Sequence, residues 1–210
     1  MKPFEKILQD NKDWAAGEIA KDANYFKRLI AIQSPEILWI GCSDSRVPAD
    51  KITGTEPGEI FVHRNVANLV VHTDLNLLSV LQYAVEVIKV KHVIVCGHHN
   101  CGGIRAALNN HSIGLIDKWL WNIKNVYQQH KEQINALATE DEKVDLLTEL
   151  NVKEQVLNLA KTSIIQKAWK NNHAPDLHGW VYDLRDGILN PVFEMPAGSK
   201  IDDIFVYDNL

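Results

Sequence analysis

The sequence predicts a single α/β domain over residues 1–210, with a mostly parallel sheet flanked by helices. Two short apolar segments, 37–40 and 92–96, each end at a glycine that is followed by polar residues. Segments of strand type alternate with segments of helical periodicity, which is typical of parallel strands joined by right-handed crossovers. We expect the strand order 2-1-3-4, with an antiparallel fifth strand.

The composition is that of an ordinary soluble globular domain, with 46% hydrophobic and 23% charged residues. A net charge of −5 gives no reason to expect a nucleic-acid or anionic-membrane partner. No apolar run approaches membrane-spanning length, and the charged start does not resemble a secretory signal, so we expect a cytoplasmic protein. The odd number of cysteines, three, argues against a disulfide framework.

The first 34 residues predict an N-terminal helical arm. Apolar residues recur at helical spacing at Tyr25, Phe26, Leu29 and Ile30, within one or two helices between Phe4 and about Gln33. The first half has a looser pattern. This arm either lies on another subunit or covers the sheet as an ordinary helix, and periodicity does not decide between the two.

The other elements follow from apolar periodicity and from residues typical of helix ends and turns. Up to the third strand we expect strands at 37–40, 59–63 and 92–96, a loop with a helical turn at 48–57, and a helix from Thr73 or Asp74 to about Val90. Beyond it we expect helices starting near Gly102 and around Trp119–Tyr127, a charged helix or loop, a helix opened by Asn151 with Glu154 as a capping box, and strands at 177–183 and 188–195 joined by Asp186-Gly187.

Ligand-type side chains follow the first and third strands. Cys42 and Asp44 lie at the first strand end, and His98 and Cys101 lie three positions apart after the third. The predicted strand order makes these two ends neighbours, at the edge where parallel sheets bind ligands. Thiolate and imidazole ligands favour zinc. Cys96, inside the strand, is expected to be a small buried residue, and a purely structural or redox role for the set is the alternative.

Five motifs make the chain resemble the β-class carbonic anhydrases over about residues 14–186. They are Cys42-Ser43-Asp44-Ser45-Arg46, His63-Arg64-Asn65-Val66-Ala67-Asn68, Leu81-Gln82-Tyr83-Ala84, His98-His99-Asn100-Cys101-Gly102-Gly103 and His178-Gly179-Trp180-Val181-Tyr182-Asp183.

The resemblance implies one zinc ion per chain, held by Cys42, His98 and Cys101. Asp44 then pairs with Arg46 and leaves the fourth position to water, or binds the zinc itself in an inactive form. Zinc lowers the pKa of its water to about 7, and the resulting hydroxide attacks carbon dioxide to give bicarbonate and a proton. We expect activity to rise with pH. His72, His99 and His111 are candidates for moving the proton to solvent.

The resemblance also implies a substrate pocket and a regulatory site. The pocket residues are Gln33, Phe61, Val66, Tyr83 and the Gly102 N–H, at a subunit interface of a homodimer or homotetramer. Trp39, Arg64 and Tyr182 match a second, non-catalytic bicarbonate site of one bacterial-type subgroup, where bicarbonate favours the inactive form. For the pocket walls the alternative is plain core, and for the triad it is an arginine stacked on aromatic rings.

Two other functions are compatible with the sequence. Hydrolysis of CS₂ or COS needs a similar zinc site and differs in pocket access. A zinc-stabilised binding or redox-sensing module predicts four permanent protein ligands and no exchangeable water.

Overall fold

The computed structural model describes residues 3–31 and 33–210, which divide into two compact units, Met1–Ser34 and Pro35–Leu210. The boundary coincides with the end of the predicted arm. Among the described residues, no helix has the length and apolar character needed to cross a membrane. The assignment of the whole chain to one domain stays a prediction.

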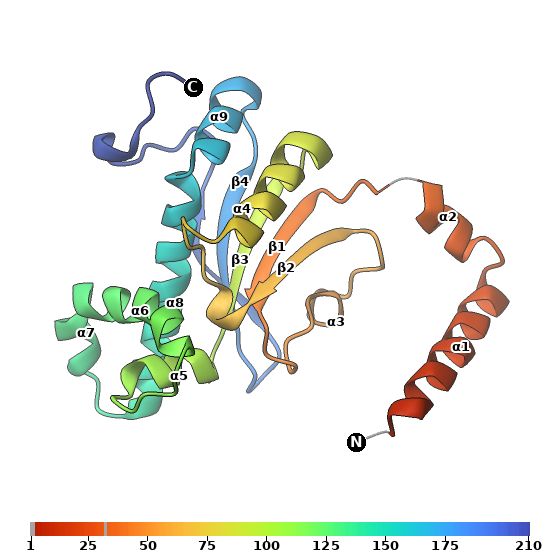
Figure 1. The fold of residues 1–210 in the computed structure, drawn as a ribbon, viewed down its shortest axis with the longest axis horizontal. Helices are drawn as coiled ribbons and strands as arrows, with labels where there is room; N and C mark the ends of the chain where they lie inside the picture. Colours follow the sequence, from red (N-terminus) through yellow and green to blue (C-terminus); the bar gives the residue numbers. More distant parts are fainter. Residues whose placement is uncertain (1–2, 32) are drawn as a thin grey trace. The chain divides into compact units, whose positions relative to one another are not determined.

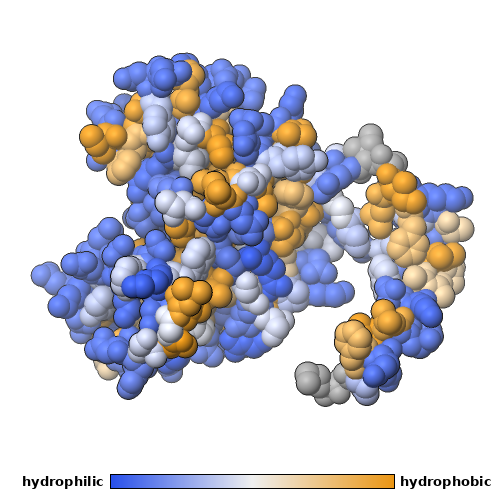
Figure 2. Space-filling model, viewed as in Figure 1, coloured by the Kyte–Doolittle hydropathy of each residue, from blue (hydrophilic) through white to orange (hydrophobic). Residues whose placement is uncertain are grey.

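The N-terminal unit holds α1 (Phe4–Lys21) and α2 (Tyr25–Ala31). The indole of Trp14 meets the rings of Tyr25 and Phe26 edge-on, with centroids 6.3 and 5.7 Å apart. No described residue of α1 is buried, and Phe4 is 78% exposed. Figure 2 shows apolar side chains on the surface of this unit. The described residues of this unit therefore present apolar surface and form no buried core.

The second unit is built on one five-stranded sheet in the order β2-β1-β3-β4-β5 (Figure 1). Its strands are β1 (Ile37–Cys42), β2 (Ile60–Asn65), β3 (His92–His98), β4 (Asp176–Tyr182) and β5 (Leu189–Met195). β1 to β4 are parallel, and β5 pairs antiparallel with β4. The predicted fold class, strand order and antiparallel fifth strand are confirmed.

The remaining elements connect these strands. They are α3 (Ala49–Thr53), the short turn η1 (Val66–Asn68), α4 (Leu75–Gln82), the π-helical η2 (Tyr83–Ile88), α5 (Gly102–Leu108), α6 (Ile116–Gln129), α7 (Lys131–Asn135), α8 (Glu140–Ala160), α9 (Ser163–Asn172) and the 3₁₀ turn η3 (Asp203–Phe205).

One face of the sheet packs against α4 and α8, and this packing forms the main core. Leu38 and Val95 from the sheet are fully buried there with Leu81 of α4 and Val156 of α8. A second apolar cluster extends from the ends of β1 and β3 to α5, α6 and α8 and includes Cys42 and Cys101. The metal-ligand candidates therefore lie at the border between the sheet and this helical layer.

Two strands run past the glycines at which we predicted their ends. A Cβ atom on Gly41 would lie 2.5 Å from Nε1 of Trp39, and one on Gly97 would lie 2.6 Å from Cγ2 of Val152. These glycines allow close packing inside β1 and β3 and do not terminate them. The strands end instead at Cys42 and His98.

Two helix predictions need correction. Asp74 caps α4, accepting from the Asn76 and Leu77 amides, but the helix changes to π-helical hydrogen bonding at Tyr83. Asn151 does not open a helix: α8 begins at Glu140, where Thr139 and Glu142 form the capping box. Asn151 lies buried inside α8, and a separate helix, α9, begins after Thr162.

Candidate active site

Three ligand-type side chains converge where β1 and β3 end side by side. Cys42 ends β1, His98 ends β3, and Cys101 follows a turn in which Asn100 has a left-handed backbone (φ 56°). The Cys42 and Cys101 sulfurs lie 4.0 Å apart, and potential ligand atoms of the three residues all lie within 4.8 Å of one another. All three residues are buried. Over residues 3–31 and 33–210, this is the one group of His, Cys, Asp and Glu close enough to hold a metal.

The protonation pattern of His98 fits a metal ligand. Its Nδ1 lies 3.0 Å from the His99 carbonyl oxygen, which can only accept, so Nδ1 carries the proton. Its Nε2 therefore has a free lone pair, and this buried atom has no hydrogen-bond partner. A backbone carbonyl that accepts from the other ring nitrogen and so fixes the ring is typical of zinc-binding histidines. The two sulfurs and one imidazole nitrogen suit zinc.

The surroundings of Cys42 favour its thiolate form. The Cys101 thiol, whose sulfur lies 4.0 Å from that of Cys42, donates to the Cys42 sulfur and lowers the pKa of Cys42. The same pairing raises the pKa of Cys101. Two adjacent thiolates need a cation between them, which a metal ion supplies.

Asp44 lies beside this group but is held by Arg46. Arg46 donates from Nε to Oδ1 (3.0 Å), from Nη2 to Oδ2 (2.7 Å), and from its backbone N to Oδ1 (2.9 Å). The guanidinium lowers the pKa of Asp44 to about 2. Oδ2 of Asp44 is 3.7 Å from Nε2 of His98, so the carboxylate lies next to the candidate ligands while both its oxygens are held by Arg46.

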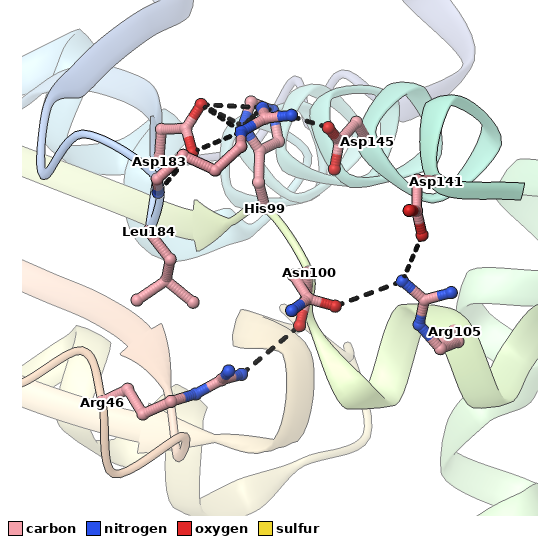
Figure 3. A pocket seen from close by; sticks show the side chains of 9 residues that line it. Arg46, His99, Asn100, Arg105, Asp141, Asp145, Asp183 and Leu184 are labelled. Atoms are coloured by element: carbon pink, nitrogen blue, oxygen red, sulfur yellow. Dashed lines mark hydrogen bonds and ion pairs between the residues drawn. The ribbon is translucent and has the colours of Figure 1, made fainter. Parts of the chain in front are cut away.

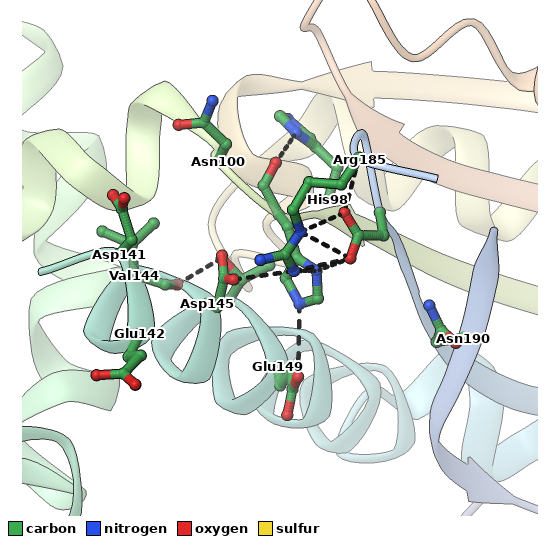
Figure 4. Close-up of polar contacts among 12 residues, drawn as sticks. His98, Asn100, Asp141, Glu142, Val144, Asp145, Glu149, Arg185 and Asn190 are labelled. Carbon is green, nitrogen blue, oxygen red and sulfur yellow. Dashed lines mark hydrogen bonds and ion pairs between the residues drawn. The ribbon is translucent and has the colours of Figure 1, made fainter. Parts of the chain in front are cut away.

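A polar cavity of about 450 Å³ lies beyond Arg46 (Figure 3). His99 is held at its wall (Figure 3): Nδ1 lies 3.2 Å from Oδ2 of Asp183 and 3.1 Å from Nη2 of Arg185, and Nε2 lies 3.4 Å from Oε1 of Glu149. Figure 4 labels Arg185 and Glu149 beside the helix that carries Glu149. This network links the turn after β3 to α8 and to the turn after β4. The sequence did not predict that Asp183, Arg185 and Glu149 contact His99, because neither residue type nor spacing indicates this contact.

The predicted pocket residues lie in both units. The rings of Phe61 and Tyr83 lie 5.9 Å apart, and Val66 is near enough to Gly103 that a Cβ there would lie 3.1 Å from its Cγ1. Gly102 opens α5 and is exposed. Gln33 belongs to the N-terminal unit, so its part in the pocket stays a prediction.

The residues of the predicted bicarbonate site share one face of the sheet, to judge from the strand register. Arg64 is opposite Gly41, and Tyr182 is opposite His98. Trp39 belongs to a small buried apolar cluster, and Tyr182 packs against that cluster. The Arg64 guanidinium donates to the carbonyl oxygens of Cys42 (2.8 Å) and Asp44 (2.5 Å), so it also holds the loop that carries the candidate ligands.

The chain is similar to known carbonic anhydrases over most of its length. Residues 37–189 match the family model for carbonic anhydrase. A carbonic anhydrase of Emericella nidulans is 47% identical over 185 residues, covering 88% of this chain and 81% of the relative.

Solved structures give the same result. One of two tetrameric β-carbonic anhydrases of Sordaria macrospora is 39% identical, with a TM-score of 0.87 over 90% of this chain and 96% of that chain. The Coccomyxa β-carbonic anhydrase in complex with acetazolamide is 36% identical, with a TM-score of 0.88 over 94% and 90% of the two chains. The chain therefore belongs to the β-class carbonic anhydrase family.

Proposed function

We propose that this carbonic anhydrase binds one zinc ion through Cys42, His98 and Cys101 and there hydrates carbon dioxide reversibly to bicarbonate and a proton. The buried Nε2 of His98, which faces two sulfurs and has no hydrogen-bond partner, is the observation that carries this proposal. When bound, zinc supplies Lewis-acid activation of a water molecule.

The chain's own residues prepare the site for that chemistry. Arg46 holds both carboxylate oxygens of Asp44, which leaves a coordination position without a protein ligand. Phe61, Val66 and Tyr83 provide apolar walls that suit carbon dioxide. The Gly102 N–H and Gln33 provide polar contacts for the substrate or product. The pairing of Asp44 with Arg46 also leads us to propose that activity rises with pH.

Metal content and carbon dioxide hydration test this function together. We expect about one zinc ion per chain and stopped-flow hydration well above the uncatalysed rate, both lost on chelation and restored by zinc. A chain with full zinc content but background turnover would contradict the proposal. That result would favour a zinc-stabilised binding module, or a hydrolase of COS or CS₂, which the same assay with those substrates detects.

The contact between the Arg46 guanidinium and Asp44 gives a sharper test of whether one coordination position stays free of protein ligands. Arg46→Ala releases the Asp44 carboxylate toward the metal, so we expect activity to fall by about 10-fold or more at neutral pH while zinc content is retained. Arg46→Lys keeps the positive charge but cannot donate to both carboxylate oxygens at once. We expect its activity to lie between those of the unmodified chain and Arg46→Ala. Unchanged activity in both variants would remove Asp44 and Arg46 from the mechanism.

We further propose that Trp39, Arg64 and Tyr182 bind bicarbonate as an inhibitor. A guanidinium, an indole N–H and a phenol hydroxyl can together hold a bicarbonate anion. Inhibition by added bicarbonate at fixed pH should weaken in Arg64→Ala. Because Arg64 also holds the ligand loop, Tyr182→Phe is the cleaner variant. Equal inhibition of all three proteins would exclude this site.

Self-association is the remaining part of the proposal. The apolar surface of the N-terminal unit and the unpaired edge of β2 both support a homodimer or homotetramer. We expect the enzyme to work in the cytoplasm, which cell fractionation would check.

A further inference from the structure

The turn between His98 and Cys101 is held by residues of two helices. Its residue Asn100 has a left-handed backbone (φ 56°), a conformation that asparagine adopts more readily than most residues. Nη2 of Arg105, in α5, donates to Oδ1 of Asn100 at 3.1 Å and to Oδ1 of Asp141, in α8, at 2.8 Å. One guanidinium nitrogen therefore joins the side chain of Asn100 to the first turn of α8.

The backbone of Asn100 contacts Arg46. Nη2 of Arg46 donates to the Asn100 carbonyl oxygen at 3.4 Å, and the same nitrogen donates to Oδ2 of Asp44 at 2.7 Å. The contacts of Asn100 with Arg46 and Arg105 lie among the residues that line the polar cavity (Figure 3). A series of contacts thus runs from α8 through Arg105 and Asn100 to the guanidinium that holds Asp44.

Arg46 needs this support, because its contact with Asp44 is open to water. The side chain of Arg46 is 50% exposed, and exposed ion pairs contribute little by themselves. At 3.4 Å the contact with the Asn100 carbonyl is near the outer limit of a hydrogen bond, so a small shift of the turn breaks it. The guanidinium then leaves Asp44 more often, and this frees a carboxylate that lies 3.7 Å from Nε2 of His98.

We propose that Arg105 is a positioning residue for the pair formed by Arg46 and Asp44: by fixing Asn100, it keeps the Arg46 guanidinium on the carboxylate. The inference rests on the proposed function, in which Asp44 stays off the metal and leaves the fourth position open. Without Arg105, Asp44 occupies that position in a larger share of the molecules. A position that is open in one molecule of about five binds an added ligand about 5-fold more weakly.

Arg105→Met tests the proposal, because it keeps an unbranched side chain and removes the donors. Arg105→Lys restores a charged nitrogen that can donate to both oxygens, so it should recover most of what Arg105→Met loses. Lys143→Met is the matched control: Lys143 pairs with Glu140 at 2.7 Å, also in the first turn of α8, in a contact that does not involve Asn100. In both pairs the carboxylate is exposed, so we expect similar, small changes in melting temperature.

Azide binding to the cobalt(II)-substituted protein measures the open position without catalysis. We expect azide, followed by visible absorption, to bind about 5-fold more weakly to Arg105→Met than to the unmodified chain, because Asp44 competes for the position. The value of kcat/KM for hydration should fall by the same factor, since both quantities depend on the same fraction of open sites. Lys143→Met should match the unmodified chain in both measurements.

A double variant tests whether Arg105 acts through Arg46. In Arg46→Ala the guanidinium is already absent, so adding Arg105→Met should change neither azide binding nor kcat/KM further. Any further loss would exclude the proposal, because Arg105 would then act by another route.

The outcomes separate this inference from the proposed function. If the unmodified cobalt protein binds no azide, no coordination position is open and the proposed function fails. If it binds azide and Arg105→Met binds it equally well, the open position stands and the role of Arg105 is excluded. An equal loss in Lys143→Met would also exclude that role, because the effect would then follow the loss of any ion pair at the start of α8.

Discussion

Asp183 shows how a single carboxylate can connect several elements near the active site. It accepts from the backbone N of Arg185 (2.8 Å) and from its guanidinium (2.7 to 3.0 Å), and it lies 3.2 Å from His99. Arg185 in turn pairs with Asp145 of α8 at 3.1 Å. Because the side chain of Asp183 is only 13% exposed, water competes weakly for these contacts.

Asp183→Asn should destabilise the fold by about 1–2 kcal/mol at neutral pH, since it removes charge-assisted hydrogen bonds. Arg185 holds the pKa of Asp183 below its usual value of 3.8, so the unfolded chain takes up the proton first. The contribution is therefore complete above about pH 4 and is lost as pH falls through the lowered pKa of the folded state. Urea unfolding between pH 7 and pH 3 measures the difference.

Exposed Asp50→Asn is the control for that series, and we expect it to match the unmodified chain at every pH. A difference between Asp183→Asn and the unmodified chain that stayed constant down to pH 3 would show that the charge of Asp183 does not contribute.

At this scale the sequence predicted the residues that carry chemistry at strand ends, and not those that support them. Cys42, His98 and Cys101 were predicted to converge because parallel strands end at a common edge, and they do. The side chains of Trp119 and Asn151 donate to the carbonyl oxygens of Val66 and Ala67 in η1, and these partners lie far apart in the chain. Periodicity and spacing contain no information about such contacts.

Helix boundaries show the same limit at the scale of single elements. Asn151 followed by Glu154 has the spacing of a capping box, and so do Thr139 and Glu142. The structure uses the second pair, in which Thr139 Oγ1 accepts from the Glu142 amide and Glu142 accepts from the Thr139 amide. The Asn151 side chain instead donates from Nδ2 to the Ala67 carbonyl oxygen in η1. Tertiary contact decided between two equal local signals.

Thr139→Ala should therefore destabilise the protein by about 1 kcal/mol, because the first turn of α8 loses its cap. For a chain of this size we expect the melting temperature to fall by about 2–4 °C in calorimetry. Thr73→Ala, at an exposed threonine, should leave the melting temperature unchanged. A drop of equal size in both variants would mean that the capping box contributes nothing.

For the whole molecule, the alternation of strand and helix patterns predicted a parallel sheet with right-handed crossovers, and the strand order that we expected for it is the observed one. What the pattern could not predict is how the apolar surface is covered. Val62 is 45% exposed on β2, an edge strand, and Ile30 in the N-terminal unit is 83% exposed. Periodicity reports that a surface is apolar and not what contacts it.

Val62→Lys tests whether the edge of β2 takes part in self-association. A charged residue on an edge strand disfavours pairing with another chain. We expect the unmodified chain to sediment as a multiple of 23.8 kDa and the variant to shift toward 23.8 kDa. Ile113→Lys, at an exposed residue outside the strands, is the control and should leave the assembly unchanged. A variant that sedimented like the unmodified chain would exclude this edge.

The positions of the three proposed ligands have a consequence for how this architecture tolerates change. The ends of two adjacent central strands, β1 and β3, position Cys42, His98 and Cys101. The long connection between β3 and β4 contains α6, α7 and α8. Loops that join α6, α7 and α8 can gain or lose residues without altering the spacing between the ends of β1 and β3. Insertions there would change the surroundings of the reaction centre and leave the three proposed ligands in place. This holds as long as Trp119 and Asn151, which donate to carbonyl oxygens of η1, are kept.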